Sequence, residues 1–419
     1  MSEATKVIAV DQLRPGIFIS LGKNWLEHPF MFSQFRISSE KQIETLKQLG
    51  IREIVYVPEK STVDPLPAAE LPVSSAPVKA ELSPEQIAAM EEKHRRMEIM
   101  KAKKAAIAKC EKAYVQSGTR FKNIMQNLFS RPAESGGEAK ELVDEIVGSF
   151  MDNSDVIIHL MGDKVHEENA YYHALNVLIL SMLLAKQLKL DAEQMKAVGL
   201  GALFHDIGKV KVPDAILRKK EPLNQSEMAF YQLHVQYGVQ LAQEIGIFPK
   251  KVVEVIRQHH EALDGSGYPM HASGDEIGIA SRIVALANAY DNLCNPPRLE
   301  ASRTPYEAMS QLFAKESSRY DIRMLKIFVS CMGVYPPGSI VELSNETFGM
   351  AISVNQSNLL KPSVLIYDRD IPKNEAIIID LAETPDLSIV KCIRPQQLPE
   401  EVFAYLNPRK SVRYYFESK

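Results

Sequence analysis

The sequence is short of the features that mark secreted, membrane and nucleic-acid-binding proteins. Only four cysteines occur in 419 residues, and they follow no spacing motif, so we expect a reduced, cytoplasmic protein without a disulfide framework. No apolar run approaches the roughly 20 residues of a membrane span, and the polar N-terminus does not resemble a signal peptide. The formal net charge of −4 argues against a nucleic-acid polymer as the main partner.

Composition and periodicity divide the chain into five segments. Short strand patterns around an amphipathic helix predict a small α+β domain at residues 1–57, and a linker rich in Pro, Ala and Ser follows at 58–84. Connecting helices are expected at 85–164 and a helical bundle at 165–332, whereas β-branched runs between turn residues predict a β-rich appendage at 333–419. The expected fold is therefore mainly α, with small β-containing units at both ends.

Features of the N-terminal half leave alternatives open. Four aromatic residues cluster within eleven positions: Trp25, Phe30, Phe32 and Phe35. They either fill a small core, which is the favoured interpretation, or contact a ligand. The helix expected from residue 85 is either a dimerising helix or a solvated helix with one narrow packed stripe, because charges interrupt its near-heptad apolar positions. A break between helices is expected at residues 130–137, SRPAESGG.

An apolar helical pattern ends abruptly at polar side chains in the sequence GALFHDIGK, residues 201–209. Burying His205 beside Asp206 is costly unless something pairs with them, and imidazole nitrogen with carboxylate oxygen suits a first-row transition metal. Lys209 follows within about one helical turn, and a cation beside a metal site favours an anionic substrate such as a phosphate. A single histidine–aspartate pair, however, is more often structural.

Further histidines fall on successive helical segments of the same bundle, and this repetition is what favours a metal site. They are His173, His234, His259 and His260. Helical bundles build metal sites from one or two inward side chains on each helix. Together with His205, these donors exceed the needs of one tetrahedral ion, so we expect two ions bridged by Asp206.

A loop rich in glycine follows the double histidine, with the sequence EALDGSGYP at residues 261–269. It is either a structural turn or a loop laid against a ligand, with Tyr268 offering a ring and a hydroxyl. The ordered set HDIGK, His234, HHE and DGSGYP resembles the HD-GYP family, which are cyclic di-GMP phosphodiesterases within the HD superfamily of metal-dependent phosphohydrolases. The resemblance covers roughly residues 165–332, and the N-terminal unit resembles a module that often precedes such domains.

The resemblance implies roles for individual residues. Six side chains would be metal ligands: His173, His205, Asp206, His234, His259 and His260. Asp206 and Lys209 would be catalytic, with Lys209 also contacting the substrate phosphate. Four residues would lie near the guanine or phosphate groups: Gly267, Tyr268, Pro269 and Arg282. Arg282 has an alternative role in a salt bridge at a helix start.

Two positions depart from the family pattern. An aspartate that normally ligates a metal is replaced here by Asn288, which coordinates weakly through its carbonyl oxygen and brings no charge. Asp291 lies one helical turn further on and is a candidate substitute. A glutamate that helps to hold a third metal in some members is replaced by Asn169, with Glu168 adjacent. Two divalent ions, iron or manganese, are therefore expected rather than three.

The expected activity is metal-dependent hydrolysis of cyclic di-GMP to pGpG and onward to GMP, by a cytoplasmic bacterial signalling protein. The replacement at residue 288 keeps two alternatives open. One is a degenerate domain that senses the dinucleotide or docks a partner without turnover, and the other is a phosphohydrolase for another cyclic dinucleotide. A homodimer or a signalling partner protein is a further expectation, although no receiver or sensor motif identifies the signal.

Overall fold

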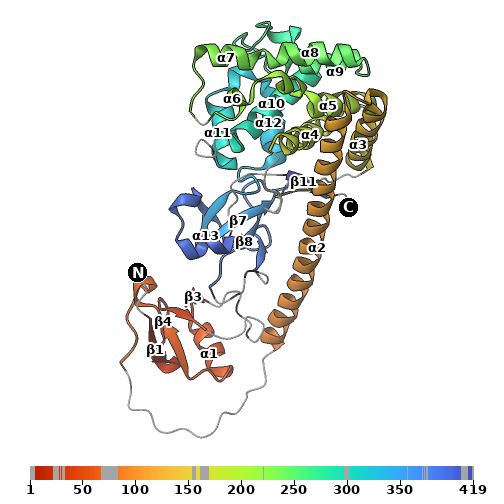
Figure 1. Cartoon of the computed structure of the whole chain (residues 1–419). Coiled ribbons are helices and arrows are strands. Elements are labelled where there is room, and N and C mark those ends of the chain that lie inside the picture. Colours follow the sequence, from red (N-terminus) through yellow and green to blue (C-terminus); the bar gives the residue numbers. More distant parts are fainter. Residues whose placement is uncertain are drawn as a thin grey trace.

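The computed structural model describes residues 5–21, 28, 30, 34–67, 84–152, 157–160, 169–219, 221–296, 302–355, 357–369, 371, 373, 376–406 and 414–417. An N-terminal α+β unit, a C-terminal sheet and a helical core lie one after another along the long axis of the molecule (Figure 1). The mainly α architecture with small β-containing units at both ends, predicted from the sequence, is confirmed. No described helix combines the length and apolar character needed to cross a lipid bilayer.

The N-terminal unit is an antiparallel sheet with strand order β1-β4-β2-β3, covered by one helix. Its elements are β1 (Lys6–Ala9), η1 (Val10–Gln12), β2 (Phe18–Ser20), β3 (Gln34–Arg36), α1 (Glu40–Gln48), β4 (Glu53–Tyr56) and η3 (Pro58–Lys60). Ile43 and Leu46 of α1 are buried against the sheet. Phe30 and Phe35 pack against the same core, with ring centroids 4.9 Å apart, as the core interpretation predicts; Trp25 and Phe32 lie outside the described residues.

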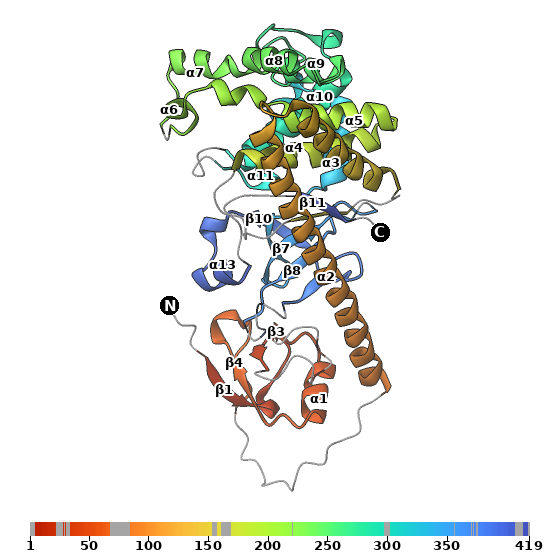
Figure 2. The same ribbon diagram turned by 45° about the vertical axis from the view of Figure 1, so that its right-hand side comes forward.

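A 44-residue helix, α2 (Pro84–Asn127), runs from the N-terminal side of the molecule to the helical core, as both views show (Figure 2). The helix α3 (Pro132–Asp152) packs against its end. The predicted break is shorter than expected, because α3 already begins at Pro132, where a missing N–H costs nothing. Gly136 lies inside α3, where a Cβ would come within 2.6 Å of Ile247.

The helical core is built around α4 and α5, which pack against each other and against α10, while α5 also packs against α9. Its elements are α4 (Asn169–Gln187), α5 (Ala192–Phe204), η4 (Ile207–Lys211), α6 (Asp214–Leu217), α7 (Gln225–Gln232), α8 (His234–Ile245), α9 (Lys250–Gln258), η5 (Gly274–Glu276), α10 (Ile279–Cys294), α11 (Pro305–Ala314), η7 (Ser317–Arg319) and α12 (Ile322–Met332). A capping box starts α5, since the Asp191 side chain accepts a hydrogen bond from Gln194 N at 2.8 Å. This buried helix carries the chain to His205 at its end.

The C-terminal unit is an antiparallel sheet with strand order β10-β6-β7-β8-β9. Its elements are β6 (Ile340–Leu343), β7 (Phe348–Ser353), β8 (Ser363–Ile366), β9 (Ile378–Asp380), β10 (Ile389–Ile393), η9 (Pro395–Gln397), α13 (Glu400–Leu406) and β11 (Tyr414–Glu417). The last strand, β11, pairs with β5 (Ile157–Leu160), a strand that lies within the segment expected to be helical. An ion pair of 3.1 Å between Arg36 and Glu346 links this unit to the N-terminal sheet.

Candidate metal centre

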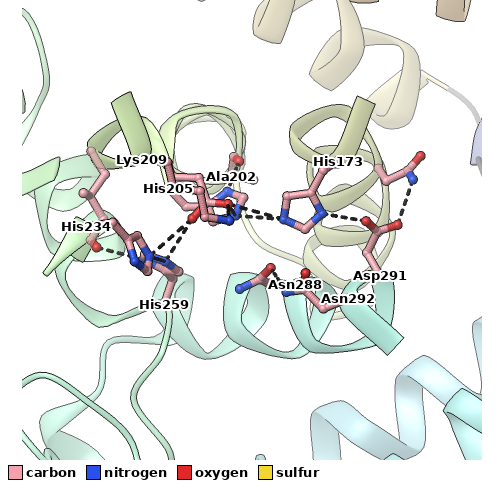
Figure 3. A network of polar contacts seen from close by, with 12 residues as sticks. His173, Ala202, His205, Lys209, His234, His259, Asn288, Asp291 and Asn292 are labelled. Atoms are coloured by element: carbon pink, nitrogen blue, oxygen red, sulfur yellow. Dashed lines mark hydrogen bonds and ion pairs between the residues drawn. The ribbon is translucent and has the colours of Figure 1, made fainter. Parts of the chain in front are cut away.

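Six side chains from separate parts of the core converge on one point. They are His173 in α4, His205 and Asp206 after α5, His234 at the start of α8, and His259 and His260 after α9. They form two groups that share the Asp206 carboxylate, and within each group the candidate ligand atoms all lie within 4.8 Å of one another. One group contains His173 and His205, and the other contains His234, His259 and His260. Figure 3 shows the imidazole rings facing this point from several helices.

Three of the histidines are held in the same way. Each donates its Nδ1–H to the backbone carbonyl three residues earlier: His205 to Ala202 (2.7 Å), His234 to Tyr231 (2.7 Å) and His259 to Ile256 (2.9 Å). These acceptors lie in the last turn of a helix, where carbonyl groups lack helical N–H partners. The hydrogen bond fixes the tautomer, so the unprotonated Nε2 of each ring faces the centre as a metal ligand would.

His173 is held by a carboxylate instead of a carbonyl. Its Nδ1 lies 2.6 Å from Asp291 Oδ2, and Asp291 is fully buried. The other carboxylate oxygen accepts from Asn176 Nδ2 at 2.7 Å and from Asn295 Nδ2 at 2.9 Å. A carboxylate behind the ring is the usual outer-shell support of a metal-binding histidine. Asp291 therefore stands behind His173 and not in the place of a ligand that substitutes for Asn288.

Some buried acceptor atoms of the centre form no hydrogen bond with the described residues. Asp206 Oδ1 and His260 Nε2 are buried and have no hydrogen-bond partner among the described residues. The Nε2 atoms of His173 and His205 lie 3.3 Å apart, as do those of His234 and His259. Metal–nitrogen bonds of about 2.1 Å place neighbouring ligand atoms about 3.0–3.4 Å apart. The residues present therefore fit divalent first-row transition ions, in two positions on either side of Asp206.

Burial sets the charges of this site. It lowers the pKa of His205 to about 4 and that of His234 to about 3, and it holds the pKa of His260 well below its usual value. Burial alone would raise the pKa of Asp206 and lower that of Lys209. For Asp206, His205 and then Lys209 outweigh burial and hold its pKa well below the usual value. For Lys209, Asp206 and then Tyr231 outweigh burial and raise its pKa. His205, His234 and His260 are thus neutral and Asp206 is a carboxylate, the protonation states that metal binding requires.

Lys209 points into the same site from η4. Its Nζ forms an ion pair with Asp206 Oδ2 and lies 5.6 Å from the ring centroid of Tyr231. The side chain as a whole is about a quarter exposed. This geometry suits a cation that faces an anionic ligand of the metals.

The loop after the double histidine folds back over the centre. The Tyr268 ring stacks on the His260 ring with centroids 4.5 Å apart, and Pro269 follows it directly. Gly267 touches the backbone of the same loop, where a Cβ would lie 2.4 Å from Ala262 N. Burial raises the pKa of the Tyr268 hydroxyl, which keeps it protonated. The loop thus presents one aromatic face and one hydroxyl beside the second ligand group.

A buried carboxylate fastens this loop. Glu261, which is 4% exposed, accepts from Met270 N at 2.7 Å and from Ala272 N at 2.9 Å. Both of its oxygens are therefore bonded to the backbone that follows Pro269. This role of Glu261 was not predicted from the sequence, in which it is one residue of the EALDGSGYP motif.

Two predicted residues have partners outside the centre. Arg282 donates from Nε to Ile277 O at 2.8 Å and from Nη2 to Gly274 O at 2.9 Å, and it pairs with Asp275 and Asp321. This arrangement favours the salt-bridge alternative for Arg282 over a substrate contact.

Asn288 is buried on α10 beside the cluster (Figure 3), and its Oδ1 accepts from Asn292 Nδ2 at 2.7 Å. That bond uses one of the two lone pairs of the carbonyl oxygen through which Asn288 would coordinate. Asn169 is the first residue of α4, while Glu168 lies outside the described residues.

Sequence analysis missed the residues that support His173. Asn176 follows His173 by three positions, in an otherwise apolar stretch of α4. A polar side chain inside a buried helix needs a hydrogen-bond partner, and that requirement was the available signal. Its partner Asp291 was noticed, but only as a candidate ligand.

A mainly helical core with a histidine–aspartate double centre is the signature of an HD-type metal-dependent domain. The family model described as an HD domain matches residues 156–324, and a domain of unknown function (DUF3391) matches residues 5–139. The chain is 30% identical over 372 residues to a cyclic di-GMP phosphodiesterase of Pseudomonas aeruginosa, covering 86% of this chain and 85% of that protein. The chain belongs to the HD-GYP family, as its motifs predicted.

Other similarities cover less of the chain or are weaker. A 3′3′-cGAMP-specific phosphodiesterase of Vibrio cholerae is 33% identical over 214 residues, which is 50% of this chain and 47% of that protein. Among solved structures, an HDG"Y"P protein of Bdellovibrio bacteriovorus matches with a TM-score of 0.44 and 19% identity, covering 78% of this chain and 98% of that one.

Proposed function

We propose that this protein is a metal-dependent phosphodiesterase that hydrolyses cyclic di-GMP to pGpG, and pGpG onward to GMP. The observation that carries the proposal is the pair of ligand groups that share Asp206, each with Nε2 lone pairs aimed at one point. The similarity over 86% of the chain to a protein named as a cyclic di-GMP phosphodiesterase supports this choice of substrate.

In this proposal, His173, His205, Asp206, His234, His259 and His260 hold two divalent ions, iron or manganese. When bound, such ions lower the pKa of a water and polarise phosphate oxygens. Hydrolysis joins the water oxygen to phosphorus and breaks the bond from phosphorus to the 3′ oxygen, which leaves with a proton. The negative charge of Asp206 raises the pKa of Lys209, so Lys209 remains a protonated ammonium. Lys209 therefore offsets phosphate charge and does not act as a base.

The loop at residues 267–269 supplies the proposed contact to the nucleotide. Tyr268 keeps its hydroxyl proton and can donate it to a phosphate oxygen or to a base, while its ring is held in place against His260. Gly267 permits the close backbone approach that sets this position. Arg282 contributes in this scheme by holding residues 274–277 through three contacts, while its fourth contact, with Asp321, anchors the guanidinium.

The first test combines metal analysis and turnover on one anaerobically purified sample. Wild-type protein is expected to carry about two metal ions per chain and to convert cyclic di-GMP to pGpG or GMP, followed by chromatography. His205→Ala should abolish turnover and lower the metal content. His94→Ala is the matched control, because residue 94 lies in α2, a helix that carries none of the six candidate ligands. Unchanged turnover in His205→Ala would refute the metal mechanism.

Binding without turnover is the second candidate function, and Asn288 is the observation that favours it. Asn288 brings no charge, and its carbonyl oxygen is bonded to Asn292. Protein that binds cyclic di-GMP but releases no product would support that candidate. Equal turnover of 3′3′-cGAMP in the same assay would broaden the substrate class. A cytoplasmic location and a homodimer or signalling partner stay part of the proposal.

A further inference from the structure

A chain of buried hydrogen bonds connects the long helix α2 to the candidate metal ligand His173. Tyr114 of α2 donates from its hydroxyl to Asn176 Oδ1 at 2.9 Å. Asn176 donates from Nδ2 to Asp291 Oδ1 at 2.7 Å. The opposite oxygen of Asp291 lies 2.6 Å from His173 Nδ1, so each link ends on an atom of the next residue.

Water has little access to this chain. Tyr114 is 1% exposed, Asn176 is 2% exposed and Asp291 is 0% exposed. The Tyr114 ring also stacks on Tyr172 of α4, with centroids 5.3 Å apart, which holds the hydroxyl oxygen in place; Tyr172 O is a second, longer acceptor for it at 3.4 Å. Buried polar networks of this kind hold their members in one geometry, because a broken link leaves a polar group without a partner.

Tyr114 connects this chain of hydrogen bonds to the distant end of α2. Tyr114 lies thirty residues after the first residue of α2, Pro84, a distance of about 45 Å along a helix axis. The opposite end of α2 lies on the side of the molecule where the N-terminal unit is found (Figures 1 and 2). A rotation or shift of α2 would therefore move the Tyr114 hydroxyl relative to Asn176 on α4.

We propose that Tyr114 is a positioning residue that couples α2 to the metal centre through Asn176, Asp291 and His173. It holds the Asp291 carboxylate in the orientation that directs His173 Nε2 toward the metal. The chain of hydrogen bonds ends on His173, which belongs to the ligand group with His205 and Asp206 and not to the other group. The rings of His234 and His259 are held by backbone carbonyls, and the ring of His260 is stacked on Tyr268. The inference rests on the proposed metal site.

The test is a Mn²⁺ titration of the metal-free full-length protein against a competing chelator, for wild type and Tyr114→Phe. The variant keeps the ring and its stacking but loses the hydroxyl. Loss of an outer-shell partner that touches the ligand costs about 10–100-fold in metal affinity. Tyr114 acts two bonds further out, so we expect about 3–10-fold weaker binding of one Mn²⁺ equivalent and unchanged binding of the other.

Two further variants separate positioning from a general structural effect. Tyr405→Phe, in α13 of the C-terminal unit, makes the same chemical change away from the centre and should leave both equivalents unchanged. In an Asn176→Ala background, Tyr114→Phe should have no further effect, because its path to Asp291 is already broken.

Each other outcome has a distinct meaning. Equal weakening of both equivalents, or none, in Tyr114→Phe would overturn the coupling. An additive effect in the double variant would also overturn it. Wild-type protein that binds no Mn²⁺ would refute the proposed metal site itself, and the coupling with it.

Discussion

Replacing Glu261 with glutamine tests whether the loop that carries Tyr268 is positioned by one buried carboxylate. Glu261 accepts two backbone N–H groups, one on each oxygen, from Met270 and Ala272. Glutamine has the same shape but only one acceptor oxygen, so its NH₂ group must face one of the two N–H donors. The substitution therefore removes one hydrogen bond and the negative charge that strengthens the other.

The magnitude follows from these two losses. A buried donor left without an acceptor costs about 1–3 kcal/mol, and hydrogen bonds to charged groups contribute about 1 kcal/mol more than neutral ones. The loop should lose about 2–4 kcal/mol of local stability, which corresponds to a roughly 30- to 900-fold larger equilibrium constant for opening. The cost is local, because the bonds join residues of one loop.

Hydrogen exchange and kinetics measure the two consequences. The amides of Met270 and Ala272 should exchange at least about 30-fold faster, and KM for cyclic di-GMP should rise while metal content stays unchanged. Glu276→Gln is the matched control in the same loop: Glu276 accepts from Ser273 N at 2.9 Å but is exposed, so water replaces the lost contact. Unchanged exchange in Glu261→Gln, or an equal change in the control, would refute the reasoning.

Two further predictions concern the metal centre. Asn288→Asp restores a charged oxygen beside the cluster and should keep or raise the metal occupancy measured by elemental analysis; a sharp fall would mean that the site is built around the Asn288–Asn292 hydrogen bond. In metal-free protein, burial lowers the folded-state pKa of His205 to about 4 and of His234 to about 3. Above pH ~6.5 both histidines are neutral in the folded and the unfolded protein, and stability does not depend on their titration. Below pH ~6.5 only the unfolded state binds the protons, so each histidine lowers the free energy of unfolding by about 1.4 kcal/mol per pH unit until the pH reaches its folded-state pKa. Urea unfolding across this range measures the slope, and a flat profile would contradict the burial of neutral rings.

The mainly α fold was predictable because its signals are local. The signal for a helix start, such as the one at Asp191, lies within a few residues of sequence, and the β-branched runs after residue 332 predict the strands of the C-terminal sheet. The pairing of β5 with β11 was not predictable, because it joins residues more than 250 positions apart and depends on tertiary contacts. The break near residue 130 was placed too broadly, since Gly136 marks close packing against Ile247 and not the end of a helix.

The candidate ligands could be predicted from residue types, whereas the residues that hydrogen-bond to these ligands could be identified only from the three-dimensional structure. Histidines on successive helices are visible in the sequence, and the structure brings all five together around Asp206. Which residue stands behind His173 depends on how α10 packs against α4. Because Asp291 lies one helical turn from Asn288, the spacing alone suggested that Asp291 is a metal ligand. The structure instead directs its carboxylate to the far side of the His173 ring.

The position of the histidines at helix ends explains how a helical core can present several neutral imidazoles without extra supporting side chains. A histidine just beyond a helix finds a carbonyl three residues back that the helix does not use. His205, His234 and His259 all donate Nδ1–H to such a carbonyl, so the helix end itself selects the tautomer. His173 lies inside α4, where the carbonyls are taken by helical N–H groups, and it therefore requires a carboxylate from another helix. This requirement leaves one of the two ligand groups dependent on how separate helices are arranged, and it is the group to which Tyr114 connects α2.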